Sequence, residues 1–286
     1  PQLLVLPNDV VLSLVGARKD WNSSREDNAG SRNWQDVMFK RSSDSGNSWT
    51  AAQVLYSESD PRPGGRRTVI GCQAGVYDAR SRRVFVLLER NNSAVLLLHS
   101  DTLGSTWSAP RDISAEVKPP RLRWGWFAST FSGIQLSHPP HAGRLLVGAD
   151  HRLGHFKWTN PEQLGVLYSD TVYSDTSGSS WRSGQPVVLT GQANNQSSEC
   201  SVAELPNGTL AMNSRNFVDY KPTRTGVGPV GRAISYSHDQ GESFAFSHIA
   251  HDLPDPVVEG SMISAGDGTD RLVFSNPSSD MTRVNM

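Results

Sequence analysis

The sequence predicts an all-β fold in which one four-stranded unit is repeated along the chain. Two observations support this prediction: a short turn motif occurs four times, and each copy is preceded by two β-type segments joined by a turn. The 286 residues include 25 Gly, 17 Pro and 8 Trp, which is a composition rich in turns and aromatic side chains. We predict a single domain over residues 1–286.

The turn motif has the form Ser-x-Asp-x-Gly-x-Ser/Thr-Trp/Phe. Short Asp and Ser side chains bind nearby backbone N–H groups and Gly adopts a positive φ, so the motif predicts a tight turn whose final aromatic residue enters the core. The copies at 42–49 and 237–244 fit the template fully. The copy at 100–107 carries one extra residue between Asp101 and Gly104, and the copy at 174–181 has Thr176 in place of Asp. We assign these turns a structural role.

The expected strands follow the same order in every repeat: a hairpin, a third strand, the turn motif and a fourth strand. The hairpins are 3–6 with 10–14, 76–77 with 84–88, 134–136 with 145–147, 201–205 with 210–213, and 261–264 with 272–274; the third strands are 37–39, 95–98, 172–173 and 234–236. This period is typical of the blade of a β-propeller, and the chain contains about four and a half such blades.

Charge and hydropathy exclude several function classes. The net charge is −1 and the pI about 6.8, so we expect no general attraction to nucleic acid. No apolar run approaches the roughly 18 residues of a transmembrane helix, and the first residues resemble a strand rather than a signal peptide. We expect Cys72 and Cys200 to be buried free thiols, and we predict no cofactor or metal. Four glycosylation sequons fit an extracellular or lysosomal protein.

Charged residues recur at one predicted end of the blades. In an antiparallel blade the start of the first strand lies beside the end of the second, and the first strands surround the central axis. Arg18, Glu199, Arg215 and Arg283 fall at or near such positions. Guanidinium groups bind carboxylates through paired N–H donors. The arrangement therefore predicts an anion-binding site at one axial opening.

The same residues carry a family resemblance. The segment 202–208, flanked by Glu199 and Arg215, resembles the part of exo-α-sialidases that holds a catalytic Glu and the second arginine of a carboxylate-binding triad. The segment 274–277 with Arg283 resembles the part that holds the third arginine, and 16–18 resembles the loop whose arginine, here Arg18, lies near the acid. The resemblance covers nearly the whole chain. It implies a six-bladed propeller, incomplete here, that hydrolyses terminal sialic acid from glycoproteins, oligosaccharides or gangliosides with retention.

The resemblance also implies roles. Glu199 would accept the proton of a Tyr nucleophile, Arg215 and Arg283 would bind the substrate carboxylate, and Asp27 would be the acid/base, with Asp36 and Asp20 as alternatives. The family's first arginine and its Tyr would lie beyond the two ends, so we expect an incomplete chain that is inactive alone. Two alternatives remain open: a sialoglycan-binding propeller without turnover, and a trans-sialidase.

Overall fold

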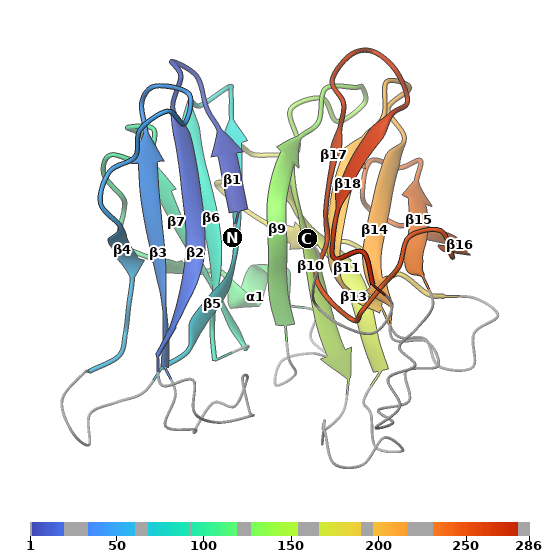
Figure 1. The fold of residues 1–286 in the computed structure, drawn as a ribbon, viewed down its shortest axis with the longest axis horizontal. Coiled ribbons are helices and arrows are strands. Elements are labelled where there is room, and N and C mark those ends of the chain that lie inside the picture. The colour runs from blue at the N-terminus through green and yellow to red at the C-terminus, as the bar shows by residue number, and fades with distance from the viewer. Residues whose placement is uncertain are drawn as a thin grey trace.

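The computed structural model describes residues 2–19, 34–60, 68–91, 93–118, 127–153, 166–189, 197–216 and 231–279. These residues form four four-stranded antiparallel sheets and one two-stranded sheet (Figure 1). The described helix α1 (Ser114–Val117) is a single turn, and no helix in the described ranges has the length and hydrophobicity needed to cross a membrane. The all-β prediction is confirmed, whereas closure into a six-bladed ring stays a prediction.

Each sheet is a meander of strands that are consecutive in the sequence. The four complete sheets contain β1 (Gln2–Val5), β2 (Val11–Lys19), β3 (Trp34–Ser42) and β4 (Gln53–Tyr56); β5 (Ile70–Asp78), β6 (Arg83–Arg90), β7 (Ala94–Ser100) and β8 (Arg111–Asp112); β9 (Phe127–Gln135), β10 (Leu145–Leu153), β11 (Val166–Ser174) and β12 (Arg182–Ser183); and β13 (Ser197–Glu204), β14 (Leu210–Asn216), β15 (Arg232–Ser237) and β16 (Ala245–Ala250). The fifth sheet contains β17 (Ser261–Ser264) and β18 (Leu272–Ser275). All five predicted hairpins are present.

Strand direction gives each sheet two distinct ends. At one end the first strand begins and the second ends, as in the pairing of Ser197 with Asn216. We call this the site end. At the other, which we call the turn end, lie the hairpin turns and the box turns, our name for the four motif turns. The register therefore places the start of each first strand beside the end of each second strand, as the blade geometry predicts.

The sheets pack face to face through apolar side chains. Leu12 and Leu14 of the first sheet share a core with Leu88 of the second, while Leu87 of the second shares a core with Val147 of the third. Strand β6 is consequently buried along both faces, because it lies between two neighbouring sheets. Each fully buried Leu or Val contributes about 1.5–3 kcal/mol. This stacking fixes the relative positions of the sheets.

The box turns have the predicted chemistry. Asp44 accepts hydrogen bonds from the Ser42 hydroxyl at 2.7 Å and from the Ser48 backbone at 2.8 Å. Gly46 has a φ of 90° and donates its N–H to the Ser42 hydroxyl. A left-handed conformation is costly for residues with a Cβ, which explains the Gly in each copy.

Two expectations about the box turns were wrong. Thr102 bonds the N–H of Thr106 at 2.8 Å, so Thr102 occupies the Asp position and the second copy has no extra residue. The preceding Asp101 instead pairs with Arg83 at 2.6 Å. The aromatic residue of the first copy, Trp49, is 37% exposed rather than buried. Its indole N–H reaches Gly46 O, as that of the buried Trp181 reaches Gly178 O, but Trp181 also packs on Phe85 of the preceding sheet.

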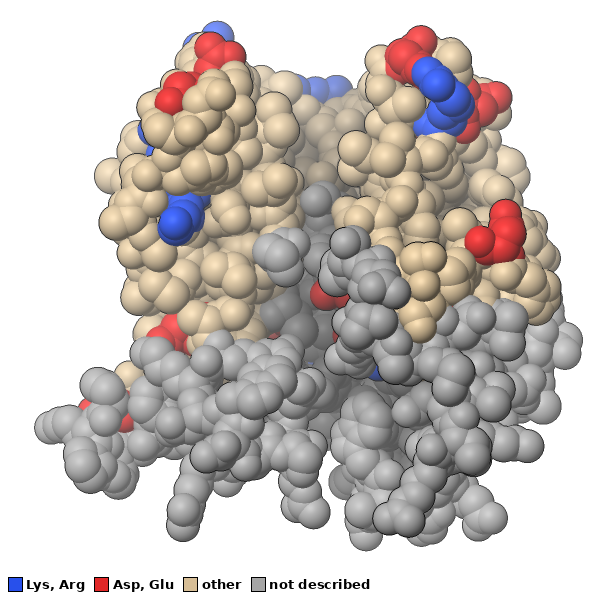
Figure 2. Space-filling view, in the orientation of Figure 1, with Lys and Arg blue, Asp and Glu red and all other residues tan. Residues whose placement is uncertain are grey.

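The described surface is hollowed between the sheets of the N-terminal half and those of the C-terminal half (Figure 2). Strands β5, β9, β13 and β17, each the first of its sheet, lie along this region, where β5 contacts β9, and β13 contacts β9 and β17. Acidic and basic atoms are visible inside the hollow in Figure 2. The innermost strands therefore line a central depression that contains charge.

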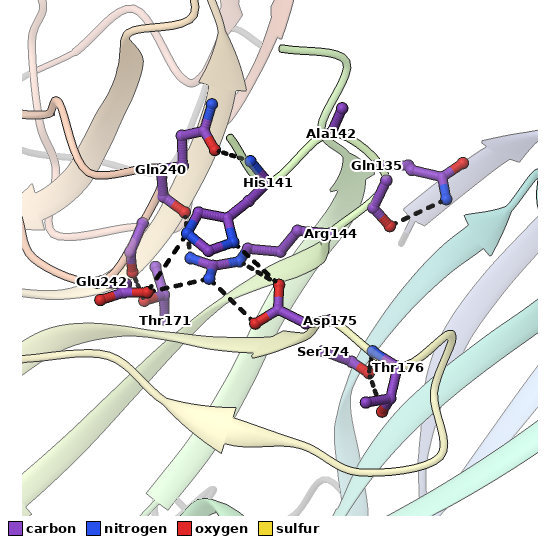
Figure 3. A network of polar contacts seen from close by, with 12 residues as sticks. Gln135, His141, Ala142, Arg144, Thr171, Ser174, Asp175, Thr176, Gln240 and Glu242 are labelled. Atoms are coloured by element: carbon purple, nitrogen blue, oxygen red, sulfur yellow. Dashed lines mark hydrogen bonds and ion pairs between the residues drawn. The ribbon is translucent and has the colours of Figure 1, made fainter. Parts of the chain in front are cut away.

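A buried arginine joins the third and fourth sheets at the turn end (Figure 3). Arg144 is 2% exposed and binds Asp175 at 2.7 Å, Glu242 at 3.0 Å and the carbonyl oxygen of Gln240 at 2.9 Å. Its guanidinium also lies 4.2 Å from the centre of the Tyr173 ring. Because these partners belong to two box turns, Arg144 fixes one blade against the next.

Candidate active site

The site end of the fourth sheet brings a carboxylate and an arginine together. Arg215, in β14, donates from Nη1 to Oε2 of Glu199, in β13, at 2.6 Å. Ser198 pairs with Arg215 and Cys200 with Ser214, so Glu199 is the extra residue of a β-bulge. A bulge turns a side chain out of the regular alternation, and here it directs Glu199 toward Arg215. The two side chains keep 30% and 11% exposure, which leaves the pair accessible at the sheet end.

Arg215 lies in an acidic environment. Burial alone would lower the pKa of Arg215, but the charge and hydrogen bond of Glu199, followed by the charges of Asp255 and Asp150, raise it overall. The guanidinium is thus a fixed cation, and it faces carboxylates from more than one sheet. Such a cation can compensate the charge of an anionic ligand in a partly enclosed site.

A second, fully buried ion pair supports the first. Arg232 and Asp255 are both 0% exposed and lie 3.1 Å apart. Arg232 also donates to Asn213 Oδ1 at 2.7 Å and to Val258 O at 2.6 Å, while the Asn216 N–H donates to Asp255 at 2.9 Å. These bonds tie the end of β14 to the chain that precedes β17. They hold Arg215 and the residues around 258 in a fixed relation.

Sequence reasoning missed two further carboxylates. Asp150 is 4% exposed in β10, and Glu259 stands just before β17. Glu259 is half-buried, and this burial, followed by the charge of Glu199 and that of Asp150, raises its pKa well above its ordinary value. Both could have been found from the blade geometry that selected Glu199, because Asp150 lies late in a second strand and Glu259 precedes a first strand.

Behind this cluster lies a second polar layer. Nδ1 of His151 contacts Asp170, both side chains are buried, and the His151 ring stacks on Tyr168 with centroids 5.0 Å apart. Cys200 is a buried free thiol, as predicted, and it contacts the carbonyl oxygen of Ala149. In the described ranges no group of three or more His, Cys, Asp and Glu side chains is arranged to hold a metal ion.

The comparison with protein families shows to which family the chain belongs. The family described as BNR repeat-like domain matches residues 21–286. The chain belongs to the sialidase family of BNR-repeat proteins.

Individual sialidases match most of the chain. It is 29% identical over 272 residues to a sialidase of Micromonospora viridifaciens, which covers 86% of the chain and 38% of that protein. It is 28% identical over 238 residues to Sialidase-3 of Rattus norvegicus, which covers 76% of the chain and 51% of that protein. The chain thus spans about half of these relatives or less.

Solved sialidase structures share the fold. The Hadza microbial sialidase Hz136 superposes with a TM-score of 0.72 at 23% identity, covering 98% of the chain and 53% of that structure. A Trypanosoma rangeli sialidase superposes with a TM-score of 0.66 at 16% identity, covering 97% and 43%. At these identities the likeness concerns the fold alone, and it agrees with the stacked four-stranded sheets.

The predicted site residues of this sialidase-family chain have different outcomes. Glu199 and Arg215 are in direct contact. Arg18 pairs with Gln35 at the site end of the first sheet, but its side chain lies outside the described part of the structure. Asp27 and Arg283, like Asp20, lie outside the described residues altogether. Among the acid/base alternatives, Asp36 is 4% exposed and bonds Ser57 at 2.6 Å.

Proposed function

We propose that this chain carries the sialic-acid-binding end of an exo-α-sialidase, built on a six-bladed propeller of which these sheets are a part. The single observation that carries the proposal is the 2.6 Å contact between Glu199 and Arg215 at the site end of the fourth sheet. Family membership supports the assignment of both residues. The substrate class is a glycan that ends in sialic acid, whose carboxylate suits an arginine site.

The chemistry would use these groups in a retaining sequence. Glu199 accepts the phenolic proton of a Tyr nucleophile, whose oxygen attacks the anomeric carbon while Asp27 protonates the departing glycosidic oxygen. Arg215 and Arg283 bind the substrate carboxylate, and Arg18 lies beside the acid. Water, deprotonated by Asp27, then displaces the Tyr oxygen, which takes its proton back from Glu199, and sialic acid is released with retained configuration.

The test is hydrolysis of a fluorogenic sialoside by the longest reading frame that contains these residues. We expect Glu199→Gln to lower kcat/KM by about 10²–10⁴-fold, because the isosteric amide cannot accept the Tyr proton. We expect Arg215→Met to raise KM, because one ligand of the substrate carboxylate is lost.

Glu204→Gln is the matched control. Glu204 lies in the same strand as Glu199 but at the turn end, where it accepts a hydrogen bond from Ser137 at 2.8 Å. The sialidase activity of the Glu204→Gln variant should stay near that of the unmodified protein. Equal rates for Glu199→Gln and Glu204→Gln would contradict the proposal, and sialoside binding without turnover in the unmodified protein would favour the lectin alternative.

A further inference from the structure

Glu259 is fixed beside Glu199 by the packing of two first strands. Ser201 of β13 donates its hydroxyl to Met262 O at 3.1 Å and accepts the Met262 N–H at 2.9 Å. Glu199 stands two positions before Ser201, and Glu259 three positions before Met262. Both strands begin at the site end and belong to neighbouring sheets. The two carboxyl groups therefore lie at nearly the same level along the strand direction.

A second anchor places Glu259 at the same end. The carbonyl oxygen of the preceding residue, Val258, accepts a hydrogen bond from Arg232 at 2.6 Å. Arg232 begins β15, whose next residue pairs with Ser214, the neighbour of Arg215. The backbone on both sides of Glu259 is therefore tied to the strands that carry Glu199 and Arg215.

The charges around Glu259 are unbalanced. Glu199 from β13 and Asp150 from β10 repel it, and Arg215 from β14 attracts it. Within the described ranges, a second cation near Arg215, Arg232, is already paired with the buried Asp255. With Glu259 ionised, it would compete with Glu199 and Asp150 for Arg215. Burial and this repulsion raise the pKa of Glu259 well above its usual range.

We propose that Glu259 is a positioning residue that sets the upper pH limit of this site: it supports Glu199 and Arg215 while it carries a proton, and it disables them when it ionises. A protonated carboxyl can donate one hydrogen bond to a neighbouring carboxylate. An ionised Glu259 would instead compete for Arg215 and repel an anionic substrate. The inference rests on the proposed function.

The first test is the pH profile of kcat/KM for Glu259→Gln. The amide is neutral at every pH, so we expect the variant to stay active and its alkaline limb to move to higher pH. At a fixed pH on that limb, kcat/KM should rise about tenfold for every pH unit by which the limb moves. Asp267→Asn, which removes an exposed carboxylate in the β17–β18 turn, should leave the profile unchanged. An alkaline limb unchanged in Glu259→Gln would overturn the inference.

The second test does not depend on activity. A carboxyl whose pKa is raised by folding loses stabilising free energy as pH rises from its unfolded value of about 4.3 toward the folded value. Glu259→Gln removes that loss, so its stability relative to the unmodified chain should increase between pH 5 and pH 8 in urea unfolding. A constant difference over this range would refute the protonated state of Glu259. Absence of sialidase activity at every pH would instead refute the proposed function.

Discussion

Single side chains decide the geometry of the box turns. The hydroxyl of Ser42, followed by Ser48, lowers the pKa of Asp44 to about 2, so this carboxylate stays ionised and keeps its hydrogen bonds. Thr102 and Thr176 perform the same backbone capping without charge. Where Thr takes this position, the adjacent Asp pairs with an arginine of the same sheet, as Asp175 does with Arg144. The motif therefore preserves a hydrogen-bond geometry rather than one residue type.

The charged form of the motif should make the fold sensitive to acid. Burial raises the pKa of Asp239, but hydrogen bonds from Ser243 and Ser237 outweigh it and lower the pKa overall. Its stabilisation is thus present above the unfolded value of about 3.9 and lost as pH falls through the folded value. We expect Asp239→Asn to lower the free energy of unfolding at pH 7 by about 0.5–1 kcal/mol, a small figure because Asp239 is exposed.

Urea unfolding at pH 7 and pH 3 checks this prediction. The loss of unfolding free energy in Asp239→Asn should be smaller at pH 3, because that pH lies below the unfolded value of about 3.9 and the unfolded carboxylate is then largely protonated. Asp252→Asn changes an exposed carboxylate outside the box turns and should have no effect at either pH. An equal loss of unfolding free energy in Asp239→Asn at both pH values would contradict an ionic role for Asp239.

At the scale of elements, neighbouring sheets are joined by polar contacts at both ends of their apolar interface. At the turn end Arg144 connects the box turns of the third and fourth sheets. At the site end the Ser169 hydroxyl donates to Ser198 O at 3.2 Å. Apolar packing is non-directional, so these bonds define how far one blade is displaced along the next. That displacement determines where Glu199 lies relative to Asp150 along the strand direction.

The contribution of the Arg144 network can be measured against a matched arginine. Arg144→Met should lower the free energy of unfolding by about 2–4 kcal/mol, because charge-assisted hydrogen bonds of a buried guanidinium are lost. Arg83 makes the equivalent pair with Asp101 in the second sheet, but the two side chains are 43% and 57% exposed. Arg83→Met should therefore cost less than about 1 kcal/mol. If Arg144→Met and Arg83→Met lowered the free energy of unfolding equally in thermal or urea unfolding, burial of Arg144 would not contribute to stability.

At the scale of the whole molecule, the first and last sheets of the series expose apolar side chains. Leu3 and Val5 of β1 are 60% and 80% exposed, and Ile263 and Val273 of the fifth sheet are each 55% exposed. Uncovered apolar sheet faces are prone to association. A closed ring, as proposed, would cover both faces by further sheet.

This exposure predicts that the 286-residue chain self-associates. The double variant Val5→Lys with Ile263→Lys should shift the population toward monomer in sedimentation velocity, because charge opposes pairing of these faces. Val188→Lys alters a valine that is 51% exposed and bridges to Ala245, away from both faces, and should leave association unchanged. A chain that is monomeric at all concentrations would contradict the prediction.

The sequence by itself determined the repeated four-stranded unit, its hairpins and its box turns. Turn chemistry and strand alternation act over a few residues, so they can be recognised without knowing what packs against them. The family resemblance predicted Glu199 and Arg215 as site residues, and the structure places the two side chains in direct contact, while their roles stay predictions. Asp27 and Arg283 stay predictions.

Only the tertiary structure decided which charges share the site. A bulge turns Glu199 toward Arg215, and the packing of separate sheets brings Glu259 and Asp150 into the same electrostatic environment. Such contacts join residues that are distant in the sequence, and they depend on the twist and displacement of whole sheets. The pattern of residues along one strand does not contain that information.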